Sequence, residues 1–442
     1  MNTKQHYTST NKFKWALVIF SFIGQVAWVV ENMYFNVFIY KMFNASATDI
    51  SLMVSASAIT AALTTLLIGA LSDRISKRKL LISLGYILWG FSILAFAFIR
   101  MDLLTKITGS VAAAASLGVS LVILMDCVMT FFGSSANDAA FNAWLTDCGT
   151  QENRGKIEGI NSMMPLIAIL AVFGGFMAFN LDNSESWTSI FLIIGSIVVF
   201  IGIIGFFLIE DHITENSENQ TSWLENVIYS FKPSVIKNNK LLYIVSLGFA
   251  VFCISIQIFM PYLILYYEKT LGMTDYVIIM APAIIIAAVA TALYGKVFDK
   301  FGFKKSVIPS ILILMLGYVF LYFTVGKLPV FIGSLFMMIG YLTGMAVFGA
   351  MVRENIPEDK SGMFQGTRII AQVLIPGIIG PFIGAKVLQN AELILNSDGT
   401  TSFLPNKNIY LAAFIVAVIL LVLLFYIFRM MEKLQKKTTS KN

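Results

Sequence analysis

The sequence alternates between long apolar runs and short polar stretches. A helix needs roughly 20 apolar residues to cross a bilayer, and irregular backbone cannot satisfy its polar groups in lipid. Runs of this length therefore predict transmembrane helices, and twelve of them are present, over residues 15–40, 50–72, 79–99, 112–145, 158–181, 188–209, 241–267, 275–295, 306–326, 329–352, 363–388 and 408–429. We expect an all-α membrane protein.

A polar stretch separates the first six runs from the last six. It is rich in Asn, Ser and Glu and lacks apolar periodicity, as is typical of a linker. The expected segments are a polar tail at 1–14, a six-helix bundle at 15–209, a linker at 210–240, a second six-helix bundle at 241–431 and a tail at 432–442. The pattern thus predicts two bundles of six transmembrane helices.

Composition and charge fit a membrane location. The chain is 57% hydrophobic and 13% charged, with a mean hydropathy of +0.80, a balance that no water-exposed globular surface tolerates. With the N-terminus inside, most of the 31 Lys and Arg residues fall on the cytoplasmic side, and those outside are Lys41, Arg100, Lys106, Lys269, Lys327, Lys386 and Lys407. Basic residues concentrate in cytoplasmic loops. We therefore expect a multi-pass protein of a bacterial inner membrane with both termini cytoplasmic, and we expect no nucleic-acid partner.

Residues typical of metal or redox chemistry are scarce. Cys127, Cys148 and Cys253 show no pairing or metal-ligand spacing, and His6 and His212 both lie in predicted cytoplasmic segments. A membrane enzyme would need such a site. We expect no metal, no cofactor and no enzymatic activity.

Two motifs recur at corresponding positions of the two halves. GALSDRISKRK (69–79) has a counterpart in GKVFDKFGFKK (295–305), and Asp147 with RGKIEG (154–159) corresponds to Glu354 with SGMFQG (361–366). Internal repeats are typical of secondary transporters. We expect a cytoplasmic gate formed by Gly69, Asp73, Arg74, Arg78, Asp147, Arg154, Gly295, Asp299, Lys300, Lys304 and Glu354. For any single Lys or Arg of this set, the alternative explanation is that the residue only helps to orient the chain in the membrane.

These motifs resemble the major facilitator superfamily, whose loop between the second and third helices carries a pattern close to G-x-x-x-D-R-x-G-R-K. The chain departs from it at Ser76 and Phe303. A weaker resemblance, through GQVAWVVENMYFN, GALSDR, AWLTD and NRGKIEG, is to the glycoside-pentoside-hexuronide and sucrose/proton symporters. The resemblance implies a monomeric secondary transporter that moves a small organic solute, with a sugar or glycoside favoured, by alternating access.

The coupling ion is expected to be the proton, with sodium left open. The melibiose carriers place paired aspartates in the second helix, where this chain has only Ser and Thr before Asp73. Acidic residues inside a bilayer are costly, and they mark ion pathways or substrate contacts. The candidates are Asp126, Glu31 and Asp138. A structural, hydrogen-bonded acid is the alternative for Asp126.

Polar residues on the helices that line the cavity of the resembling fold are candidates for solute binding. Amides hydrogen-bond hydroxyls, and aromatic rings pack on the apolar face of a sugar. On the first helix such residues share one face, with Glu31 at its margin. The full set is Gln25, Trp28, Asn32, Asn36, Thr130, Asn137, Gln257, Tyr341 and Arg368. Amides also hold helices together in lipid, which is the structural alternative.

Two other functions stay open. The 37 Phe and 21 Met residues could line an adaptable apolar pocket, as in a proton-driven exporter of lipophilic compounds. A receptor or scaffold could use a carrier fold, although the sequence shows no attached signalling domain.

Overall fold

A computed structural model describes residues 10–75, 77–149, 153–211, 229–356, 364–396 and 400–439. Within these ranges the side chains at positions 70, 73–75, 154, 365 and 434–439 are not described. The gate predictions for the side chains of Asp73, Arg74 and Arg154 therefore lie outside the described part, as do most of the predicted linker and parts of both tails.

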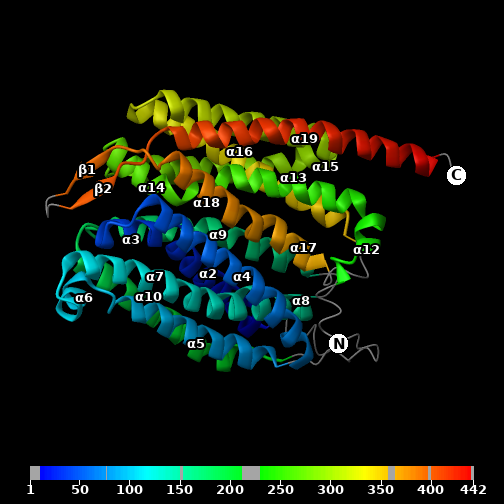
Figure 1. Ribbon diagram of the computed structural model, residues 1–442. Helices are drawn as coiled ribbons and strands as arrows, with labels where there is room; N and C mark the ends of the chain where they lie inside the picture. Colours follow the sequence, from blue (N-terminus) through cyan, green and yellow to red (C-terminus); the bar gives the residue numbers. More distant parts are fainter. Residues whose placement is uncertain are drawn as a thin grey trace. The chain divides into compact units, whose positions relative to one another are not determined.

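The chain divides into two compact units, Met1–Val227 and Ile228–Asn442. The division falls inside the stretch predicted as a linker. Figure 1 shows the helices of both units.

The first unit is entirely helical in its described part. Its first span is one long helix with a widened turn in the middle, and its fourth span is built in the same way. The elements are α2 (Asn11–Val29), η1 (Val30–Tyr34), α3 (Phe35–Phe43), α4 (Ala47–Ile75), α5 (Arg78–Phe96), α6 (Met101–Thr108), α7 (Val111–Gly133), η2 (Ser134–Phe141), α8 (Asn142–Cys148), α9 (Arg154–Phe176) and α10 (Ser184–Leu208).

The second unit adds a small hairpin to its helices. The elements are α12 (Pro233–Asn238), α13 (Lys240–Gln257), η3 (Met260–Tyr262), α14 (Leu263–Leu265), η4 (Tyr266–Thr270), α15 (Tyr276–Phe323), α16 (Lys327–Glu354), α17 (Gln365–Ile369), η6 (Ile370–Leu374), α18 (Ile375–Val387), β1 (Leu393–Leu395), β2 (Thr401–Phe403) and α19 (Asn408–Thr439). In the hairpin Leu393 pairs with Phe403 in antiparallel register. The apolar pattern did not predict this hairpin, because strands of three residues are too short to show alternation.

The described residues include eleven helices long and apolar enough to cross a membrane. The longest, α15, has 48 residues, which is about twice the length that a bilayer requires. It is broken at Gly302, where φ is 73° and ψ is 179°. A positive φ is open to glycine at little steric cost. The two parts of α15 correspond to the eighth and ninth predicted spans, so the twelve predicted spans are all present.

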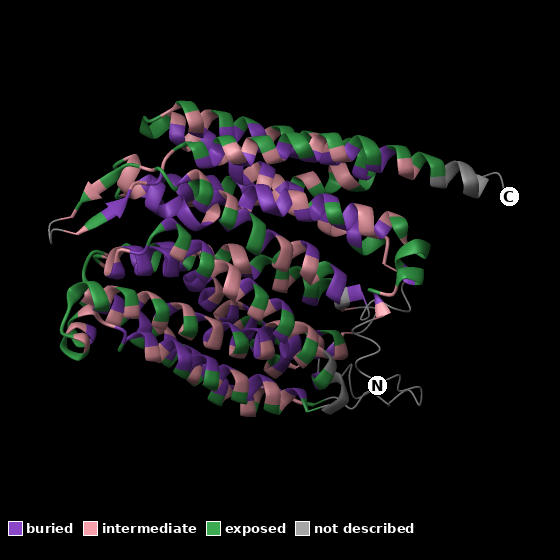
Figure 2. Ribbon diagram, viewed as in Figure 1, coloured by how far each residue is buried: buried purple, intermediate pink, exposed green. Residues whose placement is uncertain are grey.

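Close backbone contacts hold neighbouring helices together within each unit. In the first unit α5 crosses α10 where Gly90 and Gly195 face each other: a methyl group on either would come within 2.9 Å of the other's carbonyl oxygen. Small residues permit such contacts between membrane helices. Buried and exposed residues alternate along the helices, as Figure 2 shows by colour. Many large apolar residues are exposed, among them Phe200 and Leu293.

Widened π-helical turns interrupt four spans in the described part of the chain: η1, η2, η4 and η6. Such turns are rare and often occur at functional sites, because the extra residue redirects nearby side chains. In the first unit, η1 contains Glu31 and η2 contains Asp138.

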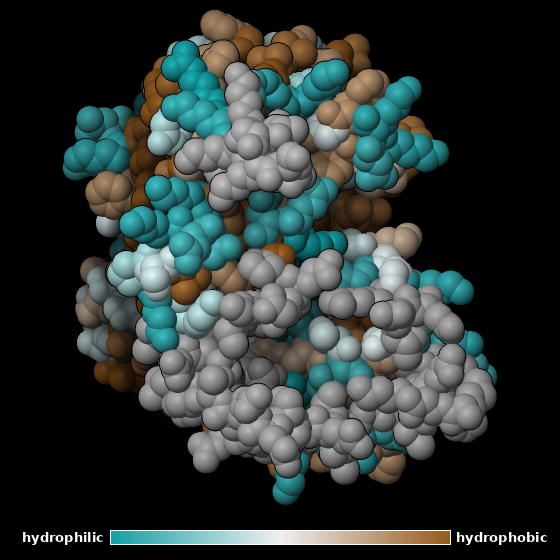
Figure 3. Space-filling view, turned by 90° about the vertical axis from the view of Figure 1, so that its right-hand side faces the viewer, coloured by the Kyte–Doolittle hydropathy of each residue, from teal (hydrophilic) through white to brown (hydrophobic). Residues whose placement is uncertain are grey.

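Figure 3 views the face on which the predicted cytoplasmic ends lie, and hydrophilic side chains gather there.

Candidate functional site

Glu31 lies in the widened turn η1, inside the first unit, with only 6% of its surface exposed. Two hydroxyl groups from other helices donate hydrogen bonds to its Oε1 atom. Ser57 of α4 donates at 2.6 Å and Thr130 of α7 at 2.9 Å, and the two hydroxyl oxygens lie 2.8 Å apart. Glu31 therefore joins three spans through a single carboxylate oxygen.

Asp126 lies one turn before Thr130 on α7 and is 2% exposed. Its Oδ1 atom and the Oε2 atom of Glu31 are buried, and neither has a hydrogen-bond partner in the described part of the chain. Glu31 is the charged group that acts most directly on Asp126. Neither carboxylate forms an ion pair with any described residue. Two buried charges of like sign are unfavourable, so this site is suited to hold a proton or a cation.

Asp138 forms a second polar centre, in η2. The Ser134 hydroxyl donates to its Oδ2 atom at 3.1 Å, and the Asn137 amide donates to its Oδ1 atom at 3.2 Å. The Tyr86 hydroxyl of α5 donates to Asn137 Oδ1 at 2.9 Å. Gly24 of α2 makes room for this arrangement, because a methyl group there would collide with Asn137 Oδ1. Three helical segments thus orient the amide that contacts Asp138.

Two tryptophans lie beside this centre. The rings of Trp28 and Trp89 are 5.1 Å apart and fill the space left by Gly133, where a methyl group would come within 2.7 Å of Trp89 and 3.0 Å of Trp28. Neither indole N–H has a hydrogen-bond partner among the described residues. Trp28 is also a polar neighbour of Asp138. Buried indole N–H groups usually find an acceptor.

The residues of the polar face predicted on the first helix differ in their exposure in the structure. Asn32 is exposed, Gln25 and Trp28 are half-buried, and Asn36 is buried. The Asn32 amide donates to the Trp28 carbonyl at 2.8 Å, and the Asn36 amide donates to the Asn32 carbonyl at 3.1 Å. The prediction assumed an uninterrupted α-helix, whereas the widened turn η1 rotates the positions that follow it. Glu31 lies within this turn and is buried, whereas the helical pattern assigned it to the margin of the polar face.

The candidates in the second unit do not form one cluster. Gln257 ends α13 and packs closely against Gly380 of α18. Tyr341, on α16, is half-buried. Arg368, on α17, is exposed, and its Nε atom donates to Gln372 Oε1 at 3.3 Å.

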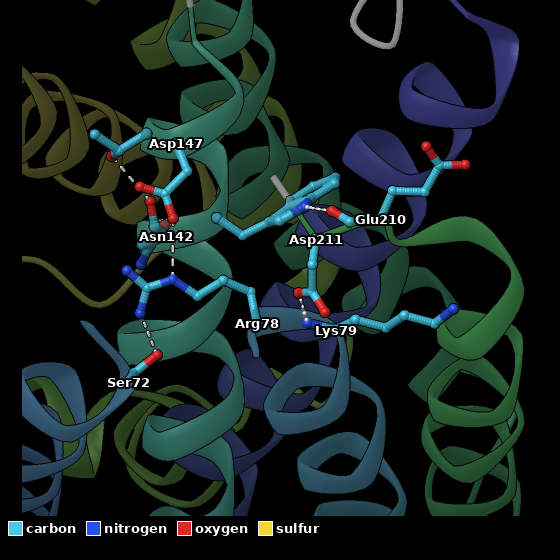
Figure 4. Close-up of polar contacts among 9 residues, drawn as sticks. Ser72, Arg78, Lys79, Asn142, Asp147, Glu210 and Asp211 are labelled. Carbon is cyan, nitrogen blue, oxygen red and sulfur yellow. Dashed lines mark hydrogen bonds and ion pairs between the residues drawn. The ribbon is translucent and has the colours of Figure 1, made fainter. Parts of the chain in front are cut away.

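A network of polar contacts connects helix ends at the predicted cytoplasmic end of the first unit (Figure 4). Arg78 is 7% exposed; its Nε atom lies 3.0 Å from Asp147 Oδ2, and its Nη1 atom donates to the Ser72 hydroxyl. The Lys79 backbone N–H donates to Asp211 Oδ1 at 2.8 Å. Two predicted gate residues, Arg78 and Asp147, are therefore in direct contact, and they join α4, α5 and α8.

Glu210 extends these contacts to the first helix. Its carboxylate pairs with Lys12 at 2.5 Å, and its carbonyl accepts a hydrogen bond from the Trp144 indole at 2.9 Å. The sequence pattern assigned Glu210 to the start of the linker and gave no role to Ser72, Glu210 or Asp211, because polar residues at a helix end look alike in sequence.

The corresponding end of the second unit is more open. Gly295, Asp299, Lys300 and Glu354 are exposed. Lys304 pairs with Glu432 of α19 at 2.5 Å, with both side chains 54% exposed. A methyl group on Gly69 or Gly295 would meet no described heavy atom within 4 Å. Neither glycine closely approaches another described helix of its own unit.

Ser57 and Ser134 contact the two carboxylate centres, and sequence reasoning assigned a role to neither. A serine within an apolar helix was the available signal. Among the described residues, no group of three or more His, Cys, Asp or Glu side chains is placed to hold a metal ion.

Solved structures of several transporters have a similar fold. A mutant of the nucleoside transporter NupG aligns with a TM-score of 0.70 at 13% identity, covering 94% of this chain and 99% of that one. A bacterial homolog of the human lysosomal transporter Spinster, inward-facing and occupied, gives 0.69 at 16%, covering 95% and 98%. A D-xylose-proton symporter gives 0.69 at 15%, covering 93% and 97%.

Sequence comparison identifies the family. A search of curated proteins finds no match. The model of the Major Facilitator Superfamily matches residues 16–381 and, in a second alignment, residues 247–442. The chain is therefore a transporter rather than an enzyme, and it belongs to the major facilitator superfamily.

Proposed function

We propose that this protein is a proton-coupled secondary transporter of a small polar organic solute, with a sugar or glycoside favoured. The observation that carries the proposal is the buried pair Glu31 and Asp126, which has free carboxylate oxygens and no cationic partner in the described part. An unpaired charge in this position is costly, whereas a protonated acid is not. Binding and release of a proton here would change the charge of the site during each transport cycle.

Coupling requires that proton and solute favour the same conformational change. Glu31 is hydrogen-bonded to α4 and α7, so its charge state acts on three spans together. A group can drive a conformational equilibrium only if it interacts differently with the two states. A carboxylate whose hydrogen bonds join several helices meets this condition.

The solute class is inferred from the groups near the carboxylates. Asn32 is exposed on the first span, and Gln25 and Trp28 are partly exposed. Amides and indole N–H groups suit a solute with several hydroxyls. Two of the similar structures, a D-xylose-proton symporter and a nucleoside transporter, are named for hydroxyl-bearing solutes, which supports the same class here.

We place the protein in a bacterial inner membrane with both termini cytoplasmic, as a monomer. In this orientation Arg78 and Asp147 lie at the cytoplasmic end. Ion pairs that form in one state and break in the other can bias a two-state equilibrium. The two residues would then form part of the inner gate.

Uptake by purified protein in liposomes tests this function. The wild type is assayed with a panel of radiolabelled sugars and glycosides, with and without an inward proton gradient and with sodium varied separately. Asp126→Asn and Glu31→Gln are expected to abolish gradient-driven accumulation, while counterflow exchange of the solute continues. Accumulation that ignores the proton gradient, or that survives both substitutions, would refute proton coupling at this site.

Export of lipophilic compounds is the second candidate, and one feature favours it. An apolar cavity of about 220 Å³ lies among α2, α9 and α10, lined by side chains that include Phe22, Val172, Phe176 and Ile194. A small lipophilic ring system fits such a lining. Dyes in the same assay distinguish the two candidates, since proton-driven dye efflux without sugar uptake would favour export.

A further inference from the structure

Polar residues recur every four positions along the fourth span. They are Asp126, Thr130, Ser134, Asp138, Asn142 and Thr146, which we call the polar ladder. Residues four apart are neighbours on a helix surface. The ladder begins on α7, passes through η2 and ends on α8, three segments that follow one another along a single span (Figure 1).

Hydrogen bonds connect successive parts of the ladder. Thr130 donates to Glu31, and Ser134 donates to Asp138. Further along, the Asn142 amide donates to the Asp138 carbonyl at 3.2 Å, and the Thr146 hydroxyl donates to the Asn142 carbonyl at 3.0 Å. Between Thr130 and Ser134 one helical turn separates two hydroxyls, a gap that a side-chain rotation or a water molecule can close.

Exposure increases along the ladder toward the predicted cytoplasmic end. Asp126 is 2% exposed, and Thr130 and Ser134 are fully buried. Asp138 is half-buried, whereas Asn142 and Thr146 are exposed. Asp138 is therefore the first acidic residue of the ladder, counted from Asp126, that is partly exposed.

The groups around Asp138 suit a transient proton acceptor. Ser134 and Asn137 of its own segment hydrogen-bond it. Trp28 of α2 is a further polar neighbour of Asp138, and Tyr86 of α5 reaches it through Asn137. Asp138 in turn acts electrostatically on Glu31 of η1. No described cation pairs with it. A fixed ion pair would hold Asp138 ionised, and its absence leaves the carboxylate able to take up and release a proton.

We propose that Asp138 relays the proton from Glu31 to the predicted cytoplasmic end through the polar ladder. This inference rests on the proposed proton coupling and adds a route for release. The proton leaves the Glu31 carboxyl group, Thr130 and Ser134 each accept one proton and pass on their own, and Asp138 becomes the acid. Asp138 then gives its proton to water beside Asn142. Glu31 ends as a carboxylate and neither hydroxyl changes its charge.

The test compares net uptake with counterflow in liposomes. Net proton-driven uptake needs proton release in every cycle, whereas counterflow exchanges solute without it. Asp138→Asn is expected to slow net uptake by about tenfold or more, as loss of a positioned proton-transfer group does, and to leave counterflow at the wild-type rate. Asp138→Glu, which retains a carboxylate, is expected to restore most of the net rate.

Two neighbouring serines give a matched control. The Ser134 hydroxyl contacts Asp138, whereas the Ser135 hydroxyl donates to the Phe131 carbonyl of its own helix at 2.6 Å. Ser134→Ala is expected to slow net uptake several-fold, and Ser135→Ala to leave it unchanged. The relay is overturned if Asp138→Asn transports at the wild-type net rate, or if it loses counterflow in equal measure, which would indicate a structural role.

The failure of coupling itself has a different signature. A pH-sensitive dye inside the liposomes reports solute-driven proton entry by the wild type. A wild type that moves solute with no proton entry overturns the proposed function. If the wild type takes up protons and Asp138→Asn takes them up at the same rate, the relay alone is overturned.

Discussion

The first and seventh spans occupy corresponding positions in the two halves, and they differ in their chemistry. Both contain a widened turn, η1 (Val30–Tyr34) in the first span and η4 (Tyr266–Thr270) in the seventh. In η1 the buried group is Glu31, which accepts hydrogen bonds from two hydroxyls. In η4 it is Tyr267, whose hydroxyl lies 2.6 Å from the Ser334 hydroxyl. The turn η4 also contains an acid, Glu268, but its side chain lies 3.5 Å from Lys269 Nζ. The buried acid of η1 has no such cation among the described residues, and this is the chemical difference between the two turns.

The surroundings of the two turns extend this difference. Near η4, the Tyr318 hydroxyl lies 3.0 Å from Ser255, and the rings of Tyr266 and Tyr410 are 5.2 Å apart. These groups are neutral and form a close-packed aromatic cluster. Neutral hydrogen bonds add modest stability and give no change of charge. We infer that the first unit performs the coupling chemistry while this part of the second unit acts as a rigid support.

The largest expected effect comes from exchanging polar for apolar groups at the two turns. Glu31→Leu leaves the Ser57 and Thr130 hydroxyls without their acceptor and removes the carboxylate. We expect proton-driven uptake to fall by about 100-fold, since hydrogen bonds to charged groups contribute about 1.5–3 kcal/mol and 1.36 kcal/mol is a factor of ten in rate. Tyr267→Phe removes one neutral hydroxyl, and we expect a change of about fivefold or less, since a neutral hydrogen bond contributes about 1 kcal/mol. Equal losses in initial rate would refute the proposed division of roles.

The second expected effect concerns the ion pairs at the predicted cytoplasmic ends. Arg78 and Asp147 have side chains 8% and 21% exposed, whereas Lys304 and Glu432 are both 54% exposed. Removing one partner of a buried pair costs about 3–5 kcal/mol, and partial exposure lowers this, so we expect Arg78→Met to destabilise the protein by about 2 kcal/mol. Lys304→Met should cost about 0.5 kcal/mol or less. Thermal unfolding in detergent measures both, and similar shifts would show that the two ends are held alike.

A third comparison uses glycines, with a smaller expected effect. A methyl group at Gly133 would come within 2.7 Å of Trp89, whereas one at Gly295 would meet no described atom within 4 Å. We expect Gly133→Ala to cost about 1–3 kcal/mol through overpacking. Gly295→Ala should raise stability by about 0.5–1 kcal/mol, because glycine is unfavourable inside a helix. Thermal unfolding again provides the measurement.

Transport by Gly295→Ala then tests the gate prediction separately. A stable variant with slowed transport would indicate that Gly295 makes its close contact in another state of the cycle. A stable variant with wild-type transport would count against any gate role for this glycine.

The sequence predicted the fold well because its signals were long and repeated. Each span is an apolar run near the length that a bilayer requires, and even the broken helix α15 appeared as two runs, since its polar segment around Asp299 separates them. Short elements gave no such signal. The hairpin at Leu393 and Phe403 and the short helix α6 lie in loops, where a few residues decide the structure.

The site was predicted in part, and the two errors have different causes. Glu31, Asp126 and Thr130 were all candidates, and the structure brings them together. Ser57 received no role, and Glu31 was placed at the edge of a face rather than inside. Ser57 lies on another helix, α4, where a single serine in an apolar run does not by itself indicate a contact with a carboxylate. The error for Glu31 follows from assuming a regular α-helical period, which the widened turn η1 breaks. No residue type in the sequence marks a π-helical turn, so this rotation could not have been foreseen.

The smallest expected effect lies at the predicted outer ends, where the two halves are similar. In the first unit the Arg100 guanidinium hydrogen-bonds Asp102 at 2.9 Å and lowers the pKa of this carboxyl below its usual value. In the second, Lys327 hydrogen-bonds Asp275 at 2.6 Å and lowers the pKa of Asp275 in the same way. Both pairs are exposed, so salt and water screen them.

The pH dependence follows from the direction of these pKa shifts. A carboxylate with a lowered pKa in the folded state stabilises the protein above its usual pKa of about 3.9, and this contribution is lost as the pH falls through the lower, folded value. We expect Arg100→Met and Lys327→Met each to reduce the unfolding temperature slightly and equally from about pH 8 to pH 5. The difference from wild type should begin to shrink near about pH 4 and vanish once the pH is below the lowered, folded pKa. An effect at one pair only, or one that grows as the pH falls, would show that the two halves differ here as well.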